Sequence, residues 1–172
     1  MATDLKRGPW SVKGYLINLK LWTQNESIHE VDHSFLEFWV QIHGLPLEYM
    51  NVETGKFIGE RMGIVEEVED PVKNNILARS FLRVRVAMEV TKALPTGFWM
   101  RRDNLPDARI HFKYERLQDS YCLNCGVLGH GRKECNKKRV MASWNLDMPK
   151  YTAGMGVNQA KAIHVAMEKE EE

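Results

Sequence analysis

Four residues in the C-terminal third of the chain have the types and spacing of a metal site. Three cysteines and one histidine follow the pattern C-x2-C-x4-H-x4-C, as Cys122, Cys125, His130 and Cys135. Three thiolates and an imidazole are the donor set of a closed tetrahedral zinc site, and the two-residue gap lets the first two thiolates reach one ion. Gly126 and Gly129 stand where such tight turns need a positive φ or a close backbone approach. We predict a structural zinc (Zn2+) site whose four positions are all filled by the protein.

Two other interpretations of the cysteines are weaker. Ordinary buried thiols need a core, and this segment is too polar and too short to bury four side chains without a metal. A redox Cys-x-x-Cys needs a thioredoxin-like βαβ setting, which the flanking sequence lacks. A closed site leaves no coordination position for water, and the chain carries no nucleotide-binding, zinc-protease or serine-hydrolase motif. We therefore expect no enzyme and no small-molecule substrate.

Positive charge is concentrated around this motif. Although 24 Lys and Arg nearly balance 23 Asp and Glu, residues 101–140 hold 10 basic and 5 acidic groups, whereas each flank is acidic by two. The last part of the motif and its extension, residues 132–139, hold five cations in eight residues: Arg132, Lys133, Lys137, Lys138 and Arg139. Beside a metal-ordered loop, such a cluster favours a strip that contacts phosphates over the alternative, a solvated terminus.

The segment from Cys122 to Cys135 resembles a CCHC zinc knuckle of the retroviral nucleocapsid and retrotransposon type. The resemblance implies zinc binding and binding of single-stranded nucleic acid, either RNA or DNA. Knuckles that stack bases usually carry an aromatic residue after the first cysteine and an apolar one after the histidine, but these positions hold Leu123 and Gly131. Weaker stacking shifts binding toward phosphate contacts, and Tyr121 is expected to compensate in part.

Upstream segments resemble a plant family that joins a domain of unknown function to such a knuckle. The segments are Gly8–Trp10, Phe38–Pro46, Phe81–Val86 and Phe112–Leu117. Proteins of that family derive from the first open reading frame of LINE-type retroelements, so the resemblance implies a retroelement-derived protein. It covers about residues 8–137, and we expect the chain to start near the end of the upstream domain, as a truncated or fragmentary product.

The elements that position the knuckle are predicted to form a small antiparallel sheet with one or two helices, an α+β class. Apolar residues predict strands at 15–22 and 38–43, and a clean alternation of apolar and polar positions predicts a strand at 81–90. Asn51 is expected to cap a helix that runs through Met62. Shorter strands are expected at 64–68, 98–100 and 109–114, the last two as a hairpin.

The order strand, helix, strand, strand from Phe38 to Val90 resembles an RNA-recognition-motif (RRM) fold. The resemblance implies a weaker second contact surface on the sheet, where Phe81, Arg83 and Arg85 share a face and offer one stacking ring and two phosphate contacts. The alternative is that these arginines pair with the acidic run Glu66, Glu67, Glu69 and Asp70. Four tryptophans are expected to be core or interface anchors, namely Trp10, Trp22, Trp39 and Trp99.

We expect four parts in the chain. They are the remnant of an upstream domain at 1–22, the RRM-like domain at 35–117, the knuckle with its basic extension at 121–139, and a flexible tail at 140–172, with a short helix at 159–168. Three cysteines without a signal peptide or a long apolar run predict an intracellular protein, in nucleus or cytoplasm, without membrane contact. The predicted function is zinc-dependent binding of single-stranded nucleic acid. The alternative is a protein-interaction or assembly module that self-associates, with the knuckle as a structural clip.

Overall fold

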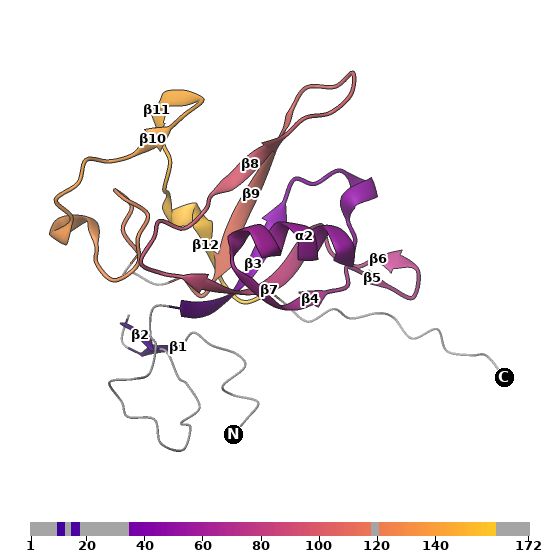
Figure 1. Cartoon of the computed structure of the whole chain (residues 1–172), viewed down its shortest axis with the longest axis horizontal. Helices are drawn as coiled ribbons and strands as arrows, with labels where there is room; N and C mark the ends of the chain where they lie inside the picture. The colour runs from indigo at the N-terminus through magenta and orange to yellow at the C-terminus, as the bar shows by residue number, and fades with distance from the viewer. Residues whose placement is uncertain (1–9, 13–14, 18–34, 118–120, 161–172) are drawn as a thin grey trace, which may run out of the picture.

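The computed structural model of the chain describes residues 10–12, 15–17, 35–117 and 121–160. Its main body is one sheet, shown in Figure 1 with the single α-helix of the described residues lying across it. The strands of this sheet are β3 (Phe35–His43), β4 (Ile64–Glu69), β7 (Phe81–Glu89), β8 (Gly97–Met100), β9 (Ala108–Glu115) and β12 (Gly156–Val157). The helix is α2 (Val52–Met62). The predicted α+β class is confirmed.

The strand order gives the sheet its RRM-like character. The order is β12-β9-β3-β7-β4, and β8 pairs with β9 beside it. All neighbours are antiparallel except β12 and β9, which run parallel. Strand β3, the first strand of the main sheet in chain order, therefore lies in the middle, between β9 and β7. The hairpin predicted from the segments 98–100 and 109–114 is seen as β8 paired with β9, and of the one or two helices expected, the described residues form one.

Strict alternation along β3 and β7 builds the core. Leu82, Val84, Val86 and Met88 are buried on one face of β7, while the residues between them are half-buried on the other. On β3, Phe38, Val40 and Ile42 meet the same apolar face. Because successive strand side chains point to opposite faces, this pattern separates an apolar face, which α2 covers, from a polar face.

Helix α2 packs closely on the sheet because it presents two glycines to it. The side chain of Asn51 caps the helix by accepting a hydrogen bond from the Thr54 N–H at 2.9 Å, as predicted. A Cβ at Gly55 would stand 2.9 Å from a methyl of Val68, and one at Gly59 would stand 2.8 Å from a methyl of Val65. The two glycines weaken the helix by about 1 kcal/mol each, and in return they allow this close approach.

Short elements complete the described chain. Two hairpins are β1 (Trp10–Val12) with β2 (Tyr15–Ile17), and β5 (Val72–Lys73) with β6 (Ile76–Leu77). A 3-10 turn, η1, covers Leu47–Tyr49. The strand predicted at 15–22 is thus seen at Tyr15–Ile17, paired with β1, and its remainder lies outside the described residues. Within the described part of the chain, no helix combines the length and apolar character needed to cross a membrane.

The segment after the knuckle departs from the predicted flexible tail. Residues 141–157 form the strands β10 (Met141–Ala142) and β11 (Asn145–Pro149), the 3-10 turn η3 (Ala153–Met155) and β12. Tyr151 and Met155 are buried, and β12 pairs with the end of β9. This part of the segment is therefore packed on the domain, because its aromatic and methionine side chains find apolar partners there. The helix expected at 159–168 lies almost wholly outside the described residues.

Candidate metal centre

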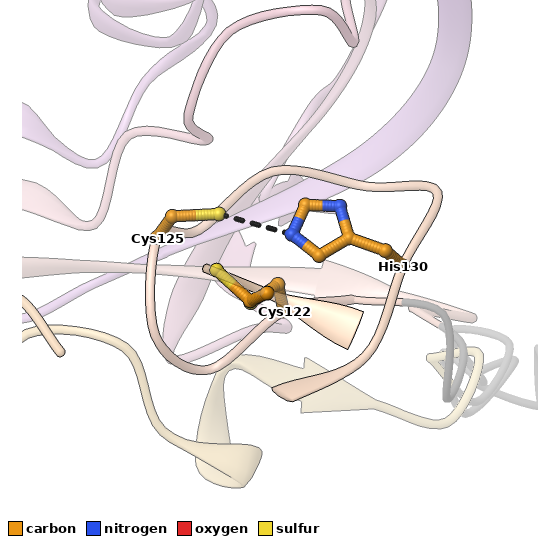
Figure 2. A group of neighbouring side chains, drawn as sticks. Cys122, Cys125 and His130 are labelled. Carbon is orange, nitrogen blue, oxygen red and sulfur yellow. Dashed lines mark hydrogen bonds between the residues drawn. The ribbon is translucent and has the colours of Figure 1, made fainter. Parts of the chain in front are cut away.

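The four predicted ligands converge on one point. One donor atom from each of Cys122, Cys125, His130 and Cys135 lies within 4.8 Å of all the others. Zinc–sulfur bonds of about 2.3 Å give tetrahedral sulfur–sulfur edges of roughly 3.8 Å, so the four atoms need only a small contraction around an ion. Figure 2 shows the Cys125 Sγ facing the imidazole of His130, with 3.4 Å between Sγ and Nε2. Nε2 is therefore the nitrogen of this ring that faces the Cys125 sulfur, and the donor set fits a metal.

Backbone hydrogen bonds close the loop that carries the first two thiols. Tyr121 and Leu128 form a β-bridge, and inside it the Cys122 N–H donates to the Val127 carbonyl at 3.1 Å. The Gly126 N–H returns to the Cys122 carbonyl at 2.8 Å, which makes the tight turn between the cysteines. The two-residue gap in the sequence therefore produces the shape that a shared ion requires.

A second short element places the last ligand. The 3-10 turn η2 (Arg132–Glu134) ends at Cys135, whose N–H donates to the Arg132 carbonyl at 3.3 Å. The carboxylate of Glu134 accepts a hydrogen bond from the Gly131 N–H at 2.9 Å, which caps the start of this turn. This turn carries Arg132 and Lys133 on its exposed side.

The environment shifts the pKa values of the first two thiols in opposite directions. Burial would raise the pKa of the Cys122 thiol, but hydrogen bonds from the N–H groups of Cys125 and Asn124, together with the neighbouring thiols, lower it overall. The pKa of the Cys125 thiol is raised, chiefly by burial and by its proximity to the Cys122 sulfur. A divalent cation binds both sulfurs as thiolates, because its positive charge stabilises the deprotonated form of each.

The knuckle is embedded in the domain. Its bridge residues Tyr121 and Leu128 are buried together with Tyr151 and Met155 of the C-terminal segment. The Leu94 N–H donates to the Gly126 carbonyl at 2.9 Å and the Val140 N–H donates to the Asn124 carbonyl at 2.9 Å. Loop residues ahead of β8 and residues 140–157 behind the knuckle therefore hold it from two sides.

Tyr121 does not lie where the sequence analysis placed it. Its ring packs edge-on against that of Tyr151, with 6.2 Å between the centroids, and its hydroxyl donates to the sulfur of Met155 at 3.5 Å. The side chain is buried, and burial raises the pKa of its hydroxyl well above the usual range. Tyr121 is thus a core residue of the knuckle, and its predicted role in base stacking is not available to it.

Replacing Gly126 by alanine is expected to lower the thermal stability and metal affinity of the knuckle. Gly126 has φ +77°, and a Cβ there would stand 2.3 Å from the ring of Tyr151. We expect a loss of about 2 to 4 kcal/mol, from backbone strain together with displacement of a buried ring. Chelator competition and thermal unfolding measure the two effects.

Gly129→Ala is the matched control, because Gly129 has φ +107° but nothing lies within 4 Å of its Cβ position. This variant adds backbone strain without a steric clash, so its stability is expected to fall by only about 1 to 2 kcal/mol. Equal losses in the two variants would contradict the close packing of Tyr151 on the loop.

The predicted basic residues lie together on the surface. Arg132, Lys133, Lys137, Lys138 and Arg139 are all exposed, and no ion pair neutralises them within the described residues. Leu123 is half-buried and packs against the core, so its side chain is only partly accessible. Five cations thus lie exposed beside the metal cluster, without an ion pair to the part of the chain that the structure describes.

The two arginines of the sheet face, Arg83 and Arg85, were predicted to contact phosphates, but carboxylates of the protein occupy them. Arg83 donates to both carboxylate oxygens of Glu115, at 2.8 and 2.9 Å, and to Glu69 at 3.1 Å. Arg85 lies 3.6 Å from Glu67 and 3.7 Å from Glu37. The sequence alternative, in which the arginines pair with acidic residues of β4, describes what is observed. Neither guanidinium is free for a phosphate.

Phe81 is engaged on the same face. Its ring lies against the imidazole of His43, with 4.7 Å between centroids, and the guanidinium of Arg79 lies over it. Burial, with the positive charges of Lys113 and His111 nearby, lowers the pKa of His43 to about 4. The imidazole is therefore neutral at pH 7. The predicted stacking position is occupied from within the protein.

Two comparisons connect the chain to known proteins. A family model described as a zinc knuckle matches residues 88–137, a range that begins at the end of β7 and includes β8, β9 and all four ligands. An uncharacterized protein of Arabidopsis thaliana is 28% identical over 142 residues, which make up 81% of this chain and 43% of that protein. The chain thus spans less than half the length of that relative. No solved structure matches it.

The match and the geometry agree on a CCHC zinc knuckle with a metal-binding Cys3His cluster. Sequence reasoning found all four ligands but missed Tyr151, which closes over the loop from 26 residues beyond the second cysteine. It also missed Trp144. A large aromatic residue in an otherwise polar tail was the available signal for each.

Proposed function

We propose that the chain binds single-stranded nucleic acid through a zinc-loaded knuckle and the cations beside it. The observation that carries this proposal is the juxtaposition of a closed Cys3His cluster with five exposed cations in eight residues, which form no ion pair with any described residue. Zinc is the ion that three thiolates and one imidazole favour in a tetrahedral site. When bound, it supplies structure and no catalysis, since no coordination position remains for water or substrate.

The cations act on the phosphate backbone of the strand. Arg132 and Lys133 project from the short turn η2 between two ligands, and Lys137, Lys138 and Arg139 follow the last ligand at once. The metal and the packed segment behind it fix the path of this backbone, so the cations form a preorganised strip. With an aliphatic Leu123 and with Gly131 at the usual stacking positions, phosphate contacts dominate over base preference.

The proposal includes a wider biological assignment. We propose that the chain is retroelement-derived, that it has no enzymatic activity and that it acts inside the cell. The support is the resemblance of the knuckle and of four upstream segments to plant proteins of LINE-type origin, together with a closed metal site. The similarity to a plant protein is consistent with this.

A salt titration tests the nucleic-acid proposal. Binding of labelled single-stranded RNA, single-stranded DNA and duplex DNA is followed by fluorescence anisotropy at several salt concentrations. If all five cations contact single-strand phosphates, log affinity falls with log salt at a slope near −3.5, about 0.7 for each contact. Replacing Lys137, Lys138 and Arg139 by glutamine in one triple variant should bring the slope near −1.4, because two contacts of about 0.7 remain. Cys125→Ser should weaken binding by removing the metal.

Lys56→Gln is the matched control, because Lys56 is an exposed lysine on α2, away from the knuckle segment. It should leave both affinity and slope unchanged. Binding that neither the cysteine nor the triple variant weakens would overturn the proposal.

A second candidate, a protein-interaction module, has one supporting observation. An apolar pocket of about 360 Å³ lies between α2 and β8, lined by Phe57, Ile58, Arg61, Met62, Pro95, Gly97, Phe98 and Phe112. Phe57 is exposed at its edge. If the wild-type protein binds no nucleic acid but sediments as an oligomer, this candidate replaces the first.

A further inference from the structure

The polar face of the sheet is divided into two electrostatically different halves. On the half formed by β7 and β4, carboxylates neutralise Arg79, Arg83 and Arg85. On the half formed by β9, the alternate positions Arg109, His111 and Lys113 face the same side, ahead of Glu115. Within the described residues, no carboxylate forms an ion pair with Arg109 or Lys113. This second half is therefore the electropositive one.

Two exposed tryptophans stand at the edge of this half. Trp99 of β8 pairs across the strand with Arg109, and Trp144 comes from the turn between β10 and β11. The two rings meet edge to face, with 5.7 Å between centroids. Trp99 is 48% exposed and Trp144 is 43% exposed. Of the two roles expected for Trp99, a core anchor or an interface anchor, the core role is wrong, since about half of the residue is exposed to solvent.

A cation is built into the tryptophan pair. The guanidinium carbon of Arg109 lies 4.2 Å from the ring centre of Trp144 and 5.8 Å from that of Trp99. Its Nη2 donates to the hydroxyl of Thr96 at 3.1 Å, which fixes the group in place. Two partly exposed indoles around an ordered guanidinium offer stacking surface and positive charge at one spot, which is what single-strand binding sites combine.

The chain connects this spot to the knuckle over a short path. The basic run Lys137 to Arg139 leads into Val140, whose N–H is bonded to the knuckle at Asn124. Lys150 directly follows β11, and its N–H donates to the carbonyl of Val140 at 3.0 Å, which closes the base of the hairpin. Trp144 is therefore carried by a hairpin whose base is anchored on the knuckle, five residues after Arg139.

We propose that Trp99 and Trp144, with Arg109 and Lys113, form a second contact surface for the same single strand that the knuckle binds. Bases stack on the two indoles, and the flanking phosphates lie near the two cations. The proposal rests on the proposed function and adds to it a stacking platform. It accounts for the aliphatic and glycine residues at the stacking positions of the knuckle itself, because the aromatic surface lies on the adjoining hairpin and strand.

The test measures binding of a labelled 12-nucleotide single-stranded RNA to the full chain. Trp144→Leu and Trp99→Leu keep apolar bulk but remove the indole, and each is expected to weaken binding on the order of 10-fold without changing the salt slope. Trp144→Phe keeps an aromatic face and should retain most of the affinity. Because Arg109 and Lys113 add to the five cations of the knuckle segment, the wild-type slope should be steeper than −3.5, and Lys113→Gln should make it shallower by about 0.7. Zinc content and thermal midpoint are measured for every variant to establish that each is folded.

Matched controls separate stacking from general surface effects. Leu146 is exposed on the same hairpin and is not aromatic, so Leu146→Ala should leave affinity and slope unchanged. Cross-linking of the wild-type protein to RNA that carries a photoreactive base needs no variant, and it should label peptides that contain Trp99 or Trp144 as well as the knuckle.

The outcomes distinguish this proposal from the proposed function. If wild-type binding is lost in Cys125→Ser but is unchanged in both leucine variants, the tryptophan surface is overturned and the knuckle function stands. Cross-links confined to the knuckle would have the same meaning. If the leucine variants change only the sedimentation of the protein, the surface contacts protein instead. If the wild-type chain binds neither single-stranded RNA nor single-stranded DNA, both proposals fall.

Discussion

Chelating the bound metal is expected to unfold more of the chain than the fourteen-residue knuckle. Metal binding stabilises small sites of this kind by about 10 kcal/mol. The C-terminal segment depends on that loop, because Tyr151 packs on Gly126 and Val140 is bonded to Asn124. We therefore expect amide protection to be lost over residues 121–157 as one unit when the metal is removed.

The sheet provides the internal reference for that experiment. Strands β3 and β7 pair over nine residues and bury Phe38, Val40 and Val84 completely, and their strand partners are each other, β9 and β4. Hydrogen exchange followed by mass spectrometry should show protection of these strands unchanged by the chelator. Cys135→Ser should reproduce the chelated pattern, whereas Asn136→Ser, at an exposed neighbour that is no ligand, should not. Residues 141–157 that stayed protected without metal would contradict this coupling.

The knuckle could be predicted from sequence because its chemistry is local. Four ligands within fourteen residues, with glycines at the turns, leave one geometry that satisfies a tetrahedral ion. The central strands could be predicted for a similar reason, since period-two alternation along 81–89 specifies both the strand and its buried face. The Asn51 cap likewise depends on a hydrogen bond between two residues, Asn51 and Thr54, that are only three positions apart in the sequence.

Features that depend on distant partners could not be predicted. Strands β10 and β12 have two residues each and no period, and they are ordered through contacts of Tyr151 and Met155 with the knuckle. The burial of Tyr121 follows from the same contacts. Tyr121 directly precedes the first ligand, and its side chain contacts Tyr151 and Met155 of the segment that follows the knuckle.

Charge pairing on the sheet is a third case, in which register decided the outcome. Alternation predicted that Arg83 and Arg85 share a face, but not which acidic residues stand opposite. A bulge between Val65 and Glu67 brings Glu67 opposite Arg85 and Glu69 opposite Arg83. Glu115, which binds Arg83 through both oxygens, comes from β9, across the intervening strand β3. One residue of slip would have reversed the face of β4.

Arg83→Met is expected to destabilise the fold by about 3 to 5 kcal/mol, the usual cost of removing one partner from a buried ion pair. The side chain of Glu115 is only 2% exposed, and without Arg83 its charge would keep the amide of Gln41, at 3.0 Å, and the backbone N–H of Ala160. Hydrogen bonds from Arg83 and Gln41 outweigh burial and hold the pKa of Glu115 below its usual 4.5. The pair therefore stabilises the protein at neutral pH, and this stability is lost as the pH falls below that value.

Arg85→Met is the matched control for this prediction, and urea unfolding at pH 7 measures both variants. The carboxylates near Arg85 are 38% and 58% exposed and lie beyond 3.5 Å, so their ion pairs should contribute less than about 1 kcal/mol. Arg83→Met/Glu115→Met should recover part of the stability, because it removes both charges. Where they remain folded, all three variants should keep the wild-type salt slope for RNA, since these arginines are occupied by carboxylates. A reduced slope in Arg83→Met would instead return the sheet face to the binding surface.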